Sequence, residues 1–201
     1  KLECCQPSGS FKIRGMEALV RACCQKRTVT RFMSSSGGNA GYSAAWVARH
    51  LGVPITVFTP TTTKALTLDQ IRLCGADVVV HGDTWDQANA ACKAAVAADP
   101  QVAFVHPFDD ERIWLGVSSL VSELRRQVPQ VPDAIVLSVG GGGLFCGICE
   151  GLHAVDDAWR DVPIVACETV GSASFAAASK AGRPVALSEI RTVATTLGAL
   201  Q

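Results

Sequence analysis

Ser8-Gly9-Ser10-Phe11-Lys12-Ile13-Arg14-Gly15 places one lysine in a short polar turn that leads directly into a helix-like run. Two further turns rich in glycine, Ser34 to Gly41 and Gly140 to Gly143, each stand between a strand-like and a helix-like segment. Ligands of an open parallel α/β sheet gather at the carboxyl ends of its strands. We therefore expect the three turns to face one site, with Lys12 carrying a cofactor.

The chain alternates apolar strand-like runs with helix-like runs along its length. Strands are predicted at 31–33, 55–59, 77–81, 102–105, 134–139 and 164–168. Helices are predicted at 13–25, 42–51, 65–74, 85–98, 113–128, 144–155 and 174–181. Continuous apolar strands alternating with helices indicate an α/β fold with parallel sheets covered on both faces.

Local signals refine this pattern. A threonine-rich turn before residue 65 is expected to cap the helix at 65–74. Asp83 or Thr84 is expected to cap the helix at 85–98. The helix at 13–25 is expected to bury one face, which carries Met16, Leu19, Val20 and Cys23. Pattern and composition shift between His106 and Arg112, which predicts a crossing between two lobes there.

Composition narrows the class of partner. The 201 residues are 48% hydrophobic, enough to bury one sizeable core or two small lobes. Eighteen basic and eighteen acidic residues cancel without a basic patch, which argues against binding to nucleic acid or to an anionic membrane surface. No apolar run reaches the roughly 18 residues that span a bilayer. The expected partner is a small molecule.

The nine cysteines are an odd count that includes two adjacent pairs, which suits a reduced, cytoplasmic protein better than a disulfide framework. Cys146 and Cys149 have metal-ligand spacing, but no second pair stands at a matching interval, so buried helix cysteines are favoured over zinc. The four histidines lie on separate segments, and structural or solvent roles are expected for them.

Gly140-Gly141-Gly142-Gly143 lies between an apolar strand and a helix, where bare amides and the positive helix end hold phosphates well. Neither the dinucleotide-binding fingerprint nor the P-loop pattern fits its spacing. The alternative is a tight structural turn, but such a turn needs one or two glycines rather than four.

The stretch Ser34 to Gly41 offers hydroxyls, the Asn39 amide and exposed backbone amides before a helix. These groups suit an anion smaller than phosphate, such as a carboxylate. Taken alone, the stretch reads equally as an N-cap with spare serines. Lys12, taken alone, reads as an ordinary surface lysine. An amine, a phosphate cradle and a carboxylate site together match pyridoxal phosphate bound to lysine, with an amino acid as substrate.

These residues also carry a resemblance. The segments Gln6 to Gly15, Ser35 to Gly41, Ser138 to Leu144 and Glu168-Thr169 resemble, in order and spacing, the serine/threonine dehydratase family of fold type II pyridoxal phosphate enzymes. The likeness covers essentially the whole chain and is closest to animal-type L-serine dehydratases and serine dehydratase-like proteins. It implies an α/β enzyme of two parallel-sheet, three-layer lobes, tryptophan synthase β-like. A large cofactor domain would comprise 1–31 and 110–201, and a small domain 32–109.

The resemblance also implies roles for single residues. Lys12 would hold the cofactor as a Schiff base and later take the substrate α-proton, with Phe11 beside the ring and Gly140, Gly141, Gly142 and Gly143 on the phosphate. Asn39 would bond the cofactor 3′-oxygen. Ser36, a catalytic candidate, would bind the substrate carboxylate with its neighbours Ser35, Gly37 and Asn39. A monovalent cation such as K⁺ would lie near Glu168, Ser172 and Ser174.

The implied reaction is β-elimination from L-serine or L-threonine, giving pyruvate or 2-oxobutanoate and ammonia. The full-length protein is expected to be a homodimer. Relatives often carry alanine where this chain has Gly37, so we expect the missing methyl group to alter side-chain tolerance or rate. Other reactions on the same cofactor, β-replacement or racemisation, would keep every motif, and so would a non-catalytic paralogue that binds amino acid or cofactor.

The family continues past the point that matches Gln201, through a part of the large domain that places a Cys or Ser beside the pyridine nitrogen. It also has a segment before the lysine motif that packs over the cofactor. We therefore expect the sequence to be a fragment, incomplete at both ends, without the residue that meets the pyridine nitrogen.

Overall fold

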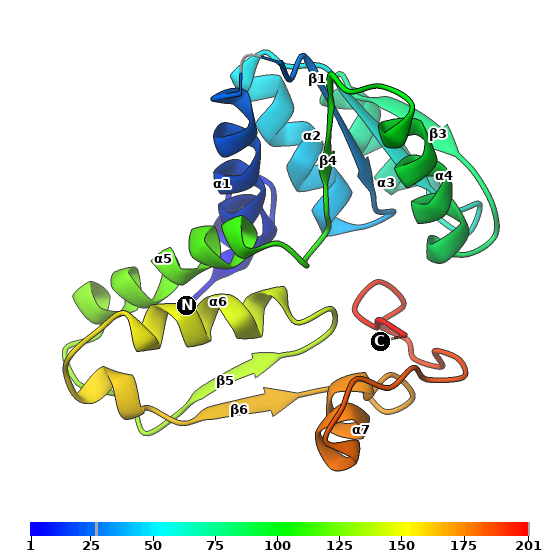
Figure 1. Cartoon of the computed structure of the whole chain (residues 1–201). Helices are drawn as coiled ribbons and strands as arrows, with labels where there is room; N and C mark the ends of the chain where they lie inside the picture. Colours follow the sequence, from blue (N-terminus) through cyan, green and yellow to red (C-terminus); the bar gives the residue numbers. More distant parts are fainter. Residues whose placement is uncertain (27, 201) are drawn as a thin grey trace. The chain divides into compact units, whose positions relative to one another are not determined.

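The computed structural model of the chain contains two compact units, Lys1–Pro107 and Phe108–Gln201 (Figure 1). The residues of each unit contact one another more than they contact the other unit. The structure describes residues 1–26 and 28–200; positions 27 and 201, which fall within the predicted domain ranges, lie outside the described residues. The division falls in the predicted crossing region. It keeps residues 1–31 with the first unit, and their predicted grouping with 110–201 stays a prediction.

The first unit is built on a four-stranded parallel sheet. Its strands are β1 (Arg31–Ser35), β2 (Ile55–Thr59), β3 (Asp77–Val80) and β4 (Val102–Val105), in the order β3-β2-β1-β4. All three pairings are parallel, as the alternating pattern predicts. Every residue of β2 is buried, which fits a central strand covered on both faces.

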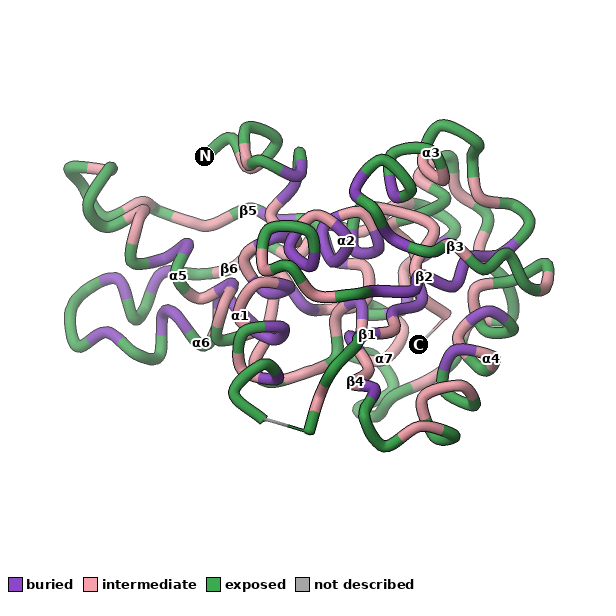
Figure 2. The backbone as a smooth tube through the Cα atoms, turned by 90° about the horizontal axis from the view of Figure 1, so that it is seen from above, coloured by how far each residue is buried: buried purple, intermediate pink, exposed green. Residues whose placement is uncertain are grey.

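Helices cover both faces of this sheet (Figures 1 and 2). They are α1 (Lys12–Cys24), α2 (Asn39–Leu51), α3 (Ala65–Leu73) and α4 (Trp85–Ala97), and a short 3-10 turn, η1 (Glu3–Cys5), precedes α1. α1 packs on α2, whereas α4 packs on the opposite face through Ala88 and Cys92. The predicted inner face of α1 is confirmed, since Met16, Leu19 and Val20 are fully buried and Cys23 nearly so.

Element ends near the predicted carboxylate site differ from the prediction. β1 continues through Ser35, which pairs in register with Phe58 of β2, so two serines expected in a loop are strand residues. α2 begins at Asn39, three residues earlier than predicted. The expected threonine cap of α3 is wrong, because Lys64 stands at its N-cap without a side-chain bond. Thr84 does cap α4, with Gln87 completing a capping box.

The second unit combines two parallel strands with two long helices that pack on each other. It contains α5 (Glu111–Gln127), β5 (Ile135–Ser138), α6 (Gly143–His153), η2 (Ala158–Asp161), β6 (Ile164–Cys167) and α7 (Ser174–Ala181). Leu137 and Val139 pack with Ile148 and Leu152 of α6 in one core. On the other face of the strands, Val136 and Val165 lie opposite one another and are 66% and 47% exposed.

Among the described residues, no helix is both long enough and apolar enough to cross a bilayer.

α5 and α6 approach closely because two glycines of α6, Gly147 and Gly151, face α5. A Cβ atom on Gly147 would overlap Val117, and one on Gly151 would overlap Val121. Gly151 is buried in this contact, whereas Glu150 beside it is exposed. The spacing of four residues sets both glycines on one face of the helix.

We expect Gly151→Ala to lower the free energy of unfolding by about 1–3 kcal/mol, because the added methyl group overpacks the contact with Val121. Urea denaturation followed by circular dichroism measures this change. Glu150→Ala, on the exposed side of the same helix, is the control and should change stability little. Equal stability of Gly151→Ala and the unaltered protein would contradict the packing described for α6.

Candidate active site

Lys12 is the first residue of α1, lies within the Ser8 to Gly15 stretch and is half-buried. Its Nζ donates a hydrogen bond to the carbonyl oxygen of Pro107 at 2.9 Å and stands 5.3 Å from the centre of the Phe11 ring. Burial of the ammonium group lowers the pKa of Lys12 from 10.5 to about 8. A substantial neutral fraction is therefore available near pH 8, which an amine needs before it can attack a carbonyl.

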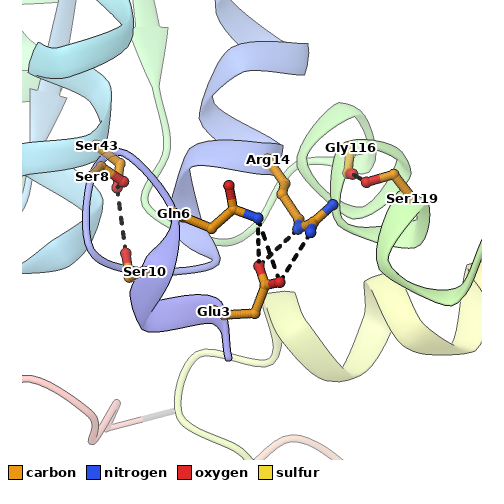
Figure 3. Close-up of polar contacts among 8 residues, drawn as sticks. All are labelled: Glu3, Gln6, Ser8, Ser10, Arg14, Ser43, Gly116 and Ser119. Carbon is orange, nitrogen blue, oxygen red and sulfur yellow. Dashed lines mark hydrogen bonds and ion pairs between the residues drawn. The ribbon is translucent and has the colours of Figure 1, made fainter. Parts of the chain in front are cut away.

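Three buried serines hold the turn before Lys12 against α2 (Figure 3). The Oγ atoms of Ser8 and Ser43 lie 2.8 Å apart, and those of Ser10 and Ser43 lie 3.5 Å apart. Ser43 stands one helical turn after Asn39, so the two residues lie along the same side of α2. The hydroxyl cluster thus fixes the lysine turn relative to the helix that carries Asn39.

A second anchor holds the chain on either side of the turn (Figure 3). Arg14 donates from Nε and Nη2 to the two carboxylate oxygens of Glu3, at 2.7 and 2.9 Å. The Gln6 amide also donates to Glu3. The side chains of Arg14 and Glu3 are only 8% and 17% exposed, so this bidentate pair is shielded from solvent. It fixes η1 to the first turn of α1.

The three serines at the end of β1 and just after it differ in their hydrogen bonds. Ser34 Oγ donates to the carbonyl of Val105 at 2.8 Å, and Ser35 Oγ donates to Oδ1 of Asn89 at 2.7 Å. Both serines are fully buried. Ser36 is half-buried, and its Oγ accepts a 3.3 Å hydrogen bond from the Gly38 amide. The Ser35 hydroxyl is therefore used within the protein, and Ser36 is nearer the surface of the turn.

The start of α2 leaves donors available. Gly38 is its N-cap and provides no side-chain cap, and Asn39 follows as an exposed first residue. Backbone amides at a helix start together with the positive end of the helix attract anions. The geometry is thus compatible with the predicted carboxylate site at Ser36 to Asn39.

Gly37 has a structural reason to be glycine. A Cβ atom at this position would overlap Oγ1 of Thr63, which lies in the loop between β2 and α3. The space that a methyl group would occupy is therefore filled by Thr63, rather than left open for a ligand.

A cavity of about 400 Å³ in the first unit adjoins these elements. It is lined by Gln6, Pro7, Ser8, Gly9, Asn39, Tyr42 and Gln70. The cavity joins the lysine turn to the start of α2, although Lys12 itself is not a lining residue. A cavity of about 520 Å³ in the second unit, lined by Ser122, Arg125, Arg126, Asp157 and Trp159, holds none of the predicted site residues.

The four-glycine turn belongs to the second unit and joins β5 to α6. Gly142 has a φ of 81°, which favours glycine, and it caps α6 without a side-chain bond. A Cβ atom on Gly140 would overlap the carbonyl oxygen of Leu197, and one on Gly141 the ring of Phe108. From the sequence, four glycines in one turn suggest that the backbone makes room for a ligand. Close packing inside the unit explains part of this run of glycines instead. The amides at the start of α6 remain suited to an anion.

The predicted cation residues lie around the start of α7. Glu168 accepts hydrogen bonds from the Phe175 and Ala176 amides at 2.8 and 2.7 Å, so its carboxylate caps that helix. Ser172 and Ser174 are buried, and Ser172 Oγ lies 2.6 Å from Thr169 Oγ1. Within the described residues no three His, Cys, Asp or Glu side chains gather as a metal site.

Cys146 and Cys149, the two cysteines with metal-ligand spacing, lie on α6 and are half-buried. Burial raises the pKa of each thiol.

The structure thus places Lys12 and the Ser36 to Asn39 turn in the first unit, and the glycine turn and Glu168 in the second. Sequence reasoning missed Thr63 and Asn89, which contact the predicted site residues Gly37 and Ser35. It also missed Ser43, whose hydroxyl meets Ser8 and Ser10 of the lysine turn. The only sequence signal for Thr63 is the threonine-rich turn, which by itself predicts a helix cap. No local pattern pointed to Ser43 or Asn89.

Comparison with known proteins identifies relatives of the whole chain. An L-serine dehydratase/L-threonine deaminase of Bos taurus is 48% identical over 198 residues, which are 98% of this chain and 60% of that protein. A serine dehydratase-like protein of Mus musculus is 45% identical over 99% of this chain and 59% of its own length. The chain therefore spans about 60% of the length of the curated relatives it matches.

Solved structures agree in fold. A fungal L-serine ammonia-lyase from Rhizomucor miehei superposes with a TM-score of 0.92 at 35% identity, over 100% of this chain and 63% of that one. A maize serine racemase superposes with a TM-score of 0.90 at 26% identity, over 99% and 59% of the two chains. The fold type II architecture expected from the sequence is confirmed. Residues 1–200 match the family model described as "Pyridoxal-phosphate dependent enzyme", and the chain belongs to that family.

Proposed function

We propose that this chain carries the lysine, phosphate and carboxylate sites of an ammonia-lyase that eliminates the β-hydroxyl group of L-serine or L-threonine with pyridoxal phosphate as cofactor. The products are pyruvate or 2-oxobutanoate, with ammonia. One observation carries the proposal: burial gives Lys12 a pKa of about 8 at the start of α1. The names of the relatives, which include L-serine dehydratase/L-threonine deaminase, support the substrate class.

The donor set fits the cofactor. Lys12 offers a partly neutral amine, the start of α6 offers amides for a phosphate, and the exposed Asn39 amide offers a hydrogen bond to a ring oxygen. Gly142 and its neighbours bring the backbone close to any group at that helix end. The proposal includes a single site formed by residues of both units. It also includes the division into a large domain, 1–31 with 110–201, and a small domain, 32–109.

When bound, the cofactor supplies an electron sink for the carbanion that forms at the substrate α-carbon. The chain's own residues bind and orient the substrate and move a proton. Ser36 and the amides up to Asn39 hold the carboxylate, while Phe11 packs near the Lys12 amine. Nζ of Lys12 takes the α-proton, because its lowered pKa allows the neutral form to act as a base. The Ser8, Ser10 and Ser43 cluster keeps that amine in position.

Racemisation on the same cofactor is the second candidate, favoured by the structural likeness to maize serine racemase. Formation of D-serine from L-serine, rather than of ammonia, distinguishes it. The remaining expectations are also part of the proposal: a homodimer in the whole protein, a cytoplasmic location, and a monovalent cation near Glu168, Ser172 and Ser174.

We expect the protein to take up pyridoxal phosphate with a visible absorption band that shifts when L-serine is added, and to release ammonia with pyruvate. Lys12→Ala should abolish the band and the activity, because it removes the amine that binds the cofactor. Lys26→Ala, at an exposed lysine after α1, is the matched control and should retain both. A colourless protein that takes up no cofactor would overturn the proposed function.

The rate of cofactor uptake should rise with pH around a midpoint near 8. Below this pH, Lys12 is protonated and does not attack the aldehyde; above it, the neutral amine predominates. Stopped-flow absorbance at a series of pH values, starting from cofactor-free protein, measures the profile. A midpoint near 10.5, the ordinary lysine value, would show that the amine is not desolvated.

A further inference from the structure

Two threonine hydroxyls stand out because each is buried without a hydrogen-bond partner in the described structure, Oγ1 of Thr59 and Oγ1 of Thr63. A buried hydroxyl without a partner forfeits the bonds that it made to water in the unfolded chain. Valine fills nearly the same volume without that loss. Such a group therefore calls for a partner beyond the protein atoms described.

The position of Thr63 points to what that partner is. Its Oγ1 is the atom nearest to the point where a Cβ of Gly37 would stand, so the hydroxyl lies directly against the Ser36-Gly37-Gly38 turn. The same turn provides the uncapped start of α2. Because residue 37 has no side chain, the hydroxyl packs directly against the backbone of the turn.

The loop that carries Thr63 is held from two sides. The Thr63 amide donates to the Pro60 carbonyl at 3.0 Å, closing the turn after β2. Thr61 is fixed by its amide to the Gly82 carbonyl and by its hydroxyl to Asp83, both at 2.8 Å. β2 itself pairs with β1, and the Ser36 amide donates to the Phe58 carbonyl at 3.0 Å. Thr63 is thus positioned against the turn before any ligand arrives.

We propose that Oγ1 of Thr63 donates a hydrogen bond to the carboxylate of the amino acid bound at the Ser36 to Asn39 turn, which makes Thr63 a further substrate-binding residue. This inference rests on the proposed function. The surrounding groups are backbone donors at a positive helix end, so they favour an anion there. A hydroxyl that donates to a carboxylate forms a charge-assisted bond, stronger than a bond between neutral groups.

The test is Thr63→Val in the full chain loaded with pyridoxal phosphate, titrated with L-serine and with L-alanine through the shift of the visible band. L-alanine has the same carboxylate but no β-hydroxyl group. We expect the affinity for both to fall about tenfold or more, as the loss of a hydrogen bond to a charged group predicts. The melting temperature of the cofactor-free variant should stay equal or rise, because an unpaired hydroxyl is removed.

Two control variants separate this role from a structural one. Thr63→Ser keeps the hydroxyl and should restore most of the affinity. Thr62→Val makes the same chemical change at the exposed neighbouring threonine and should leave affinity unchanged.

Each remaining outcome overturns the inference. Unchanged affinity in Thr63→Val means that the hydroxyl does not meet the ligand, and a lower melting temperature means that it is paired inside the protein. Loss of affinity for L-serine alone assigns the contact to the β-hydroxyl group instead of the carboxylate. If the unaltered protein shows no cofactor band, the proposed function fails first, and the two failures are thereby distinguished.

Discussion

Removal of the Lys12 ammonium from water is the constraint on which the site depends. A lysine on the surface stays protonated at neutral pH, whereas burial lowers the pKa of Lys12 to about 8. The protein achieves this by placing Lys12 at the first position of α1, whose apolar face is packed into the core. The carbonyl of Pro107 gives Nζ one fixed acceptor, so the amine is oriented as well as desolvated.

Such a position needs a rigid support, and polar contacts on both sides of Lys12 provide it. The bidentate pair of Arg14 and Glu3 joins the chain before the turn to the helix after it. The buried hydroxyl of Ser43 joins the turn to α2. Hydrogen bonds shielded from water are costly to break, since their groups would remain buried without partners. The lysine turn and the start of α2 are therefore held together within the first unit.

The predictions from sequence succeeded where the signal was local and periodic. β2, β4 and α7 have their predicted bounds, and the buried face of α1 was identified residue by residue. They failed at polar ends of elements: β1 extends through two serines because β2 pairs beside it, and the threonines before α3 do not cap it. Serine and threonine are ambiguous in sequence because a hydroxyl serves equally as a cap, as a core hydrogen bond or as a ligand contact.

The sequence by itself determined the family, the alternation of strands and helices, and the three turns that we propose form the site, because these follow from residue type and spacing. The tertiary structure decided which polar groups of those turns are engaged within the protein. Ser35 bonds Asn89, Glu168 caps α7, and a neighbouring loop fills the space beside Gly37. It also lowered the pKa of Lys12, the lysine within the Ser8 to Gly15 stretch. These pairings and the desolvation of Lys12 depend on segments distant in sequence, so no local pattern could reveal them.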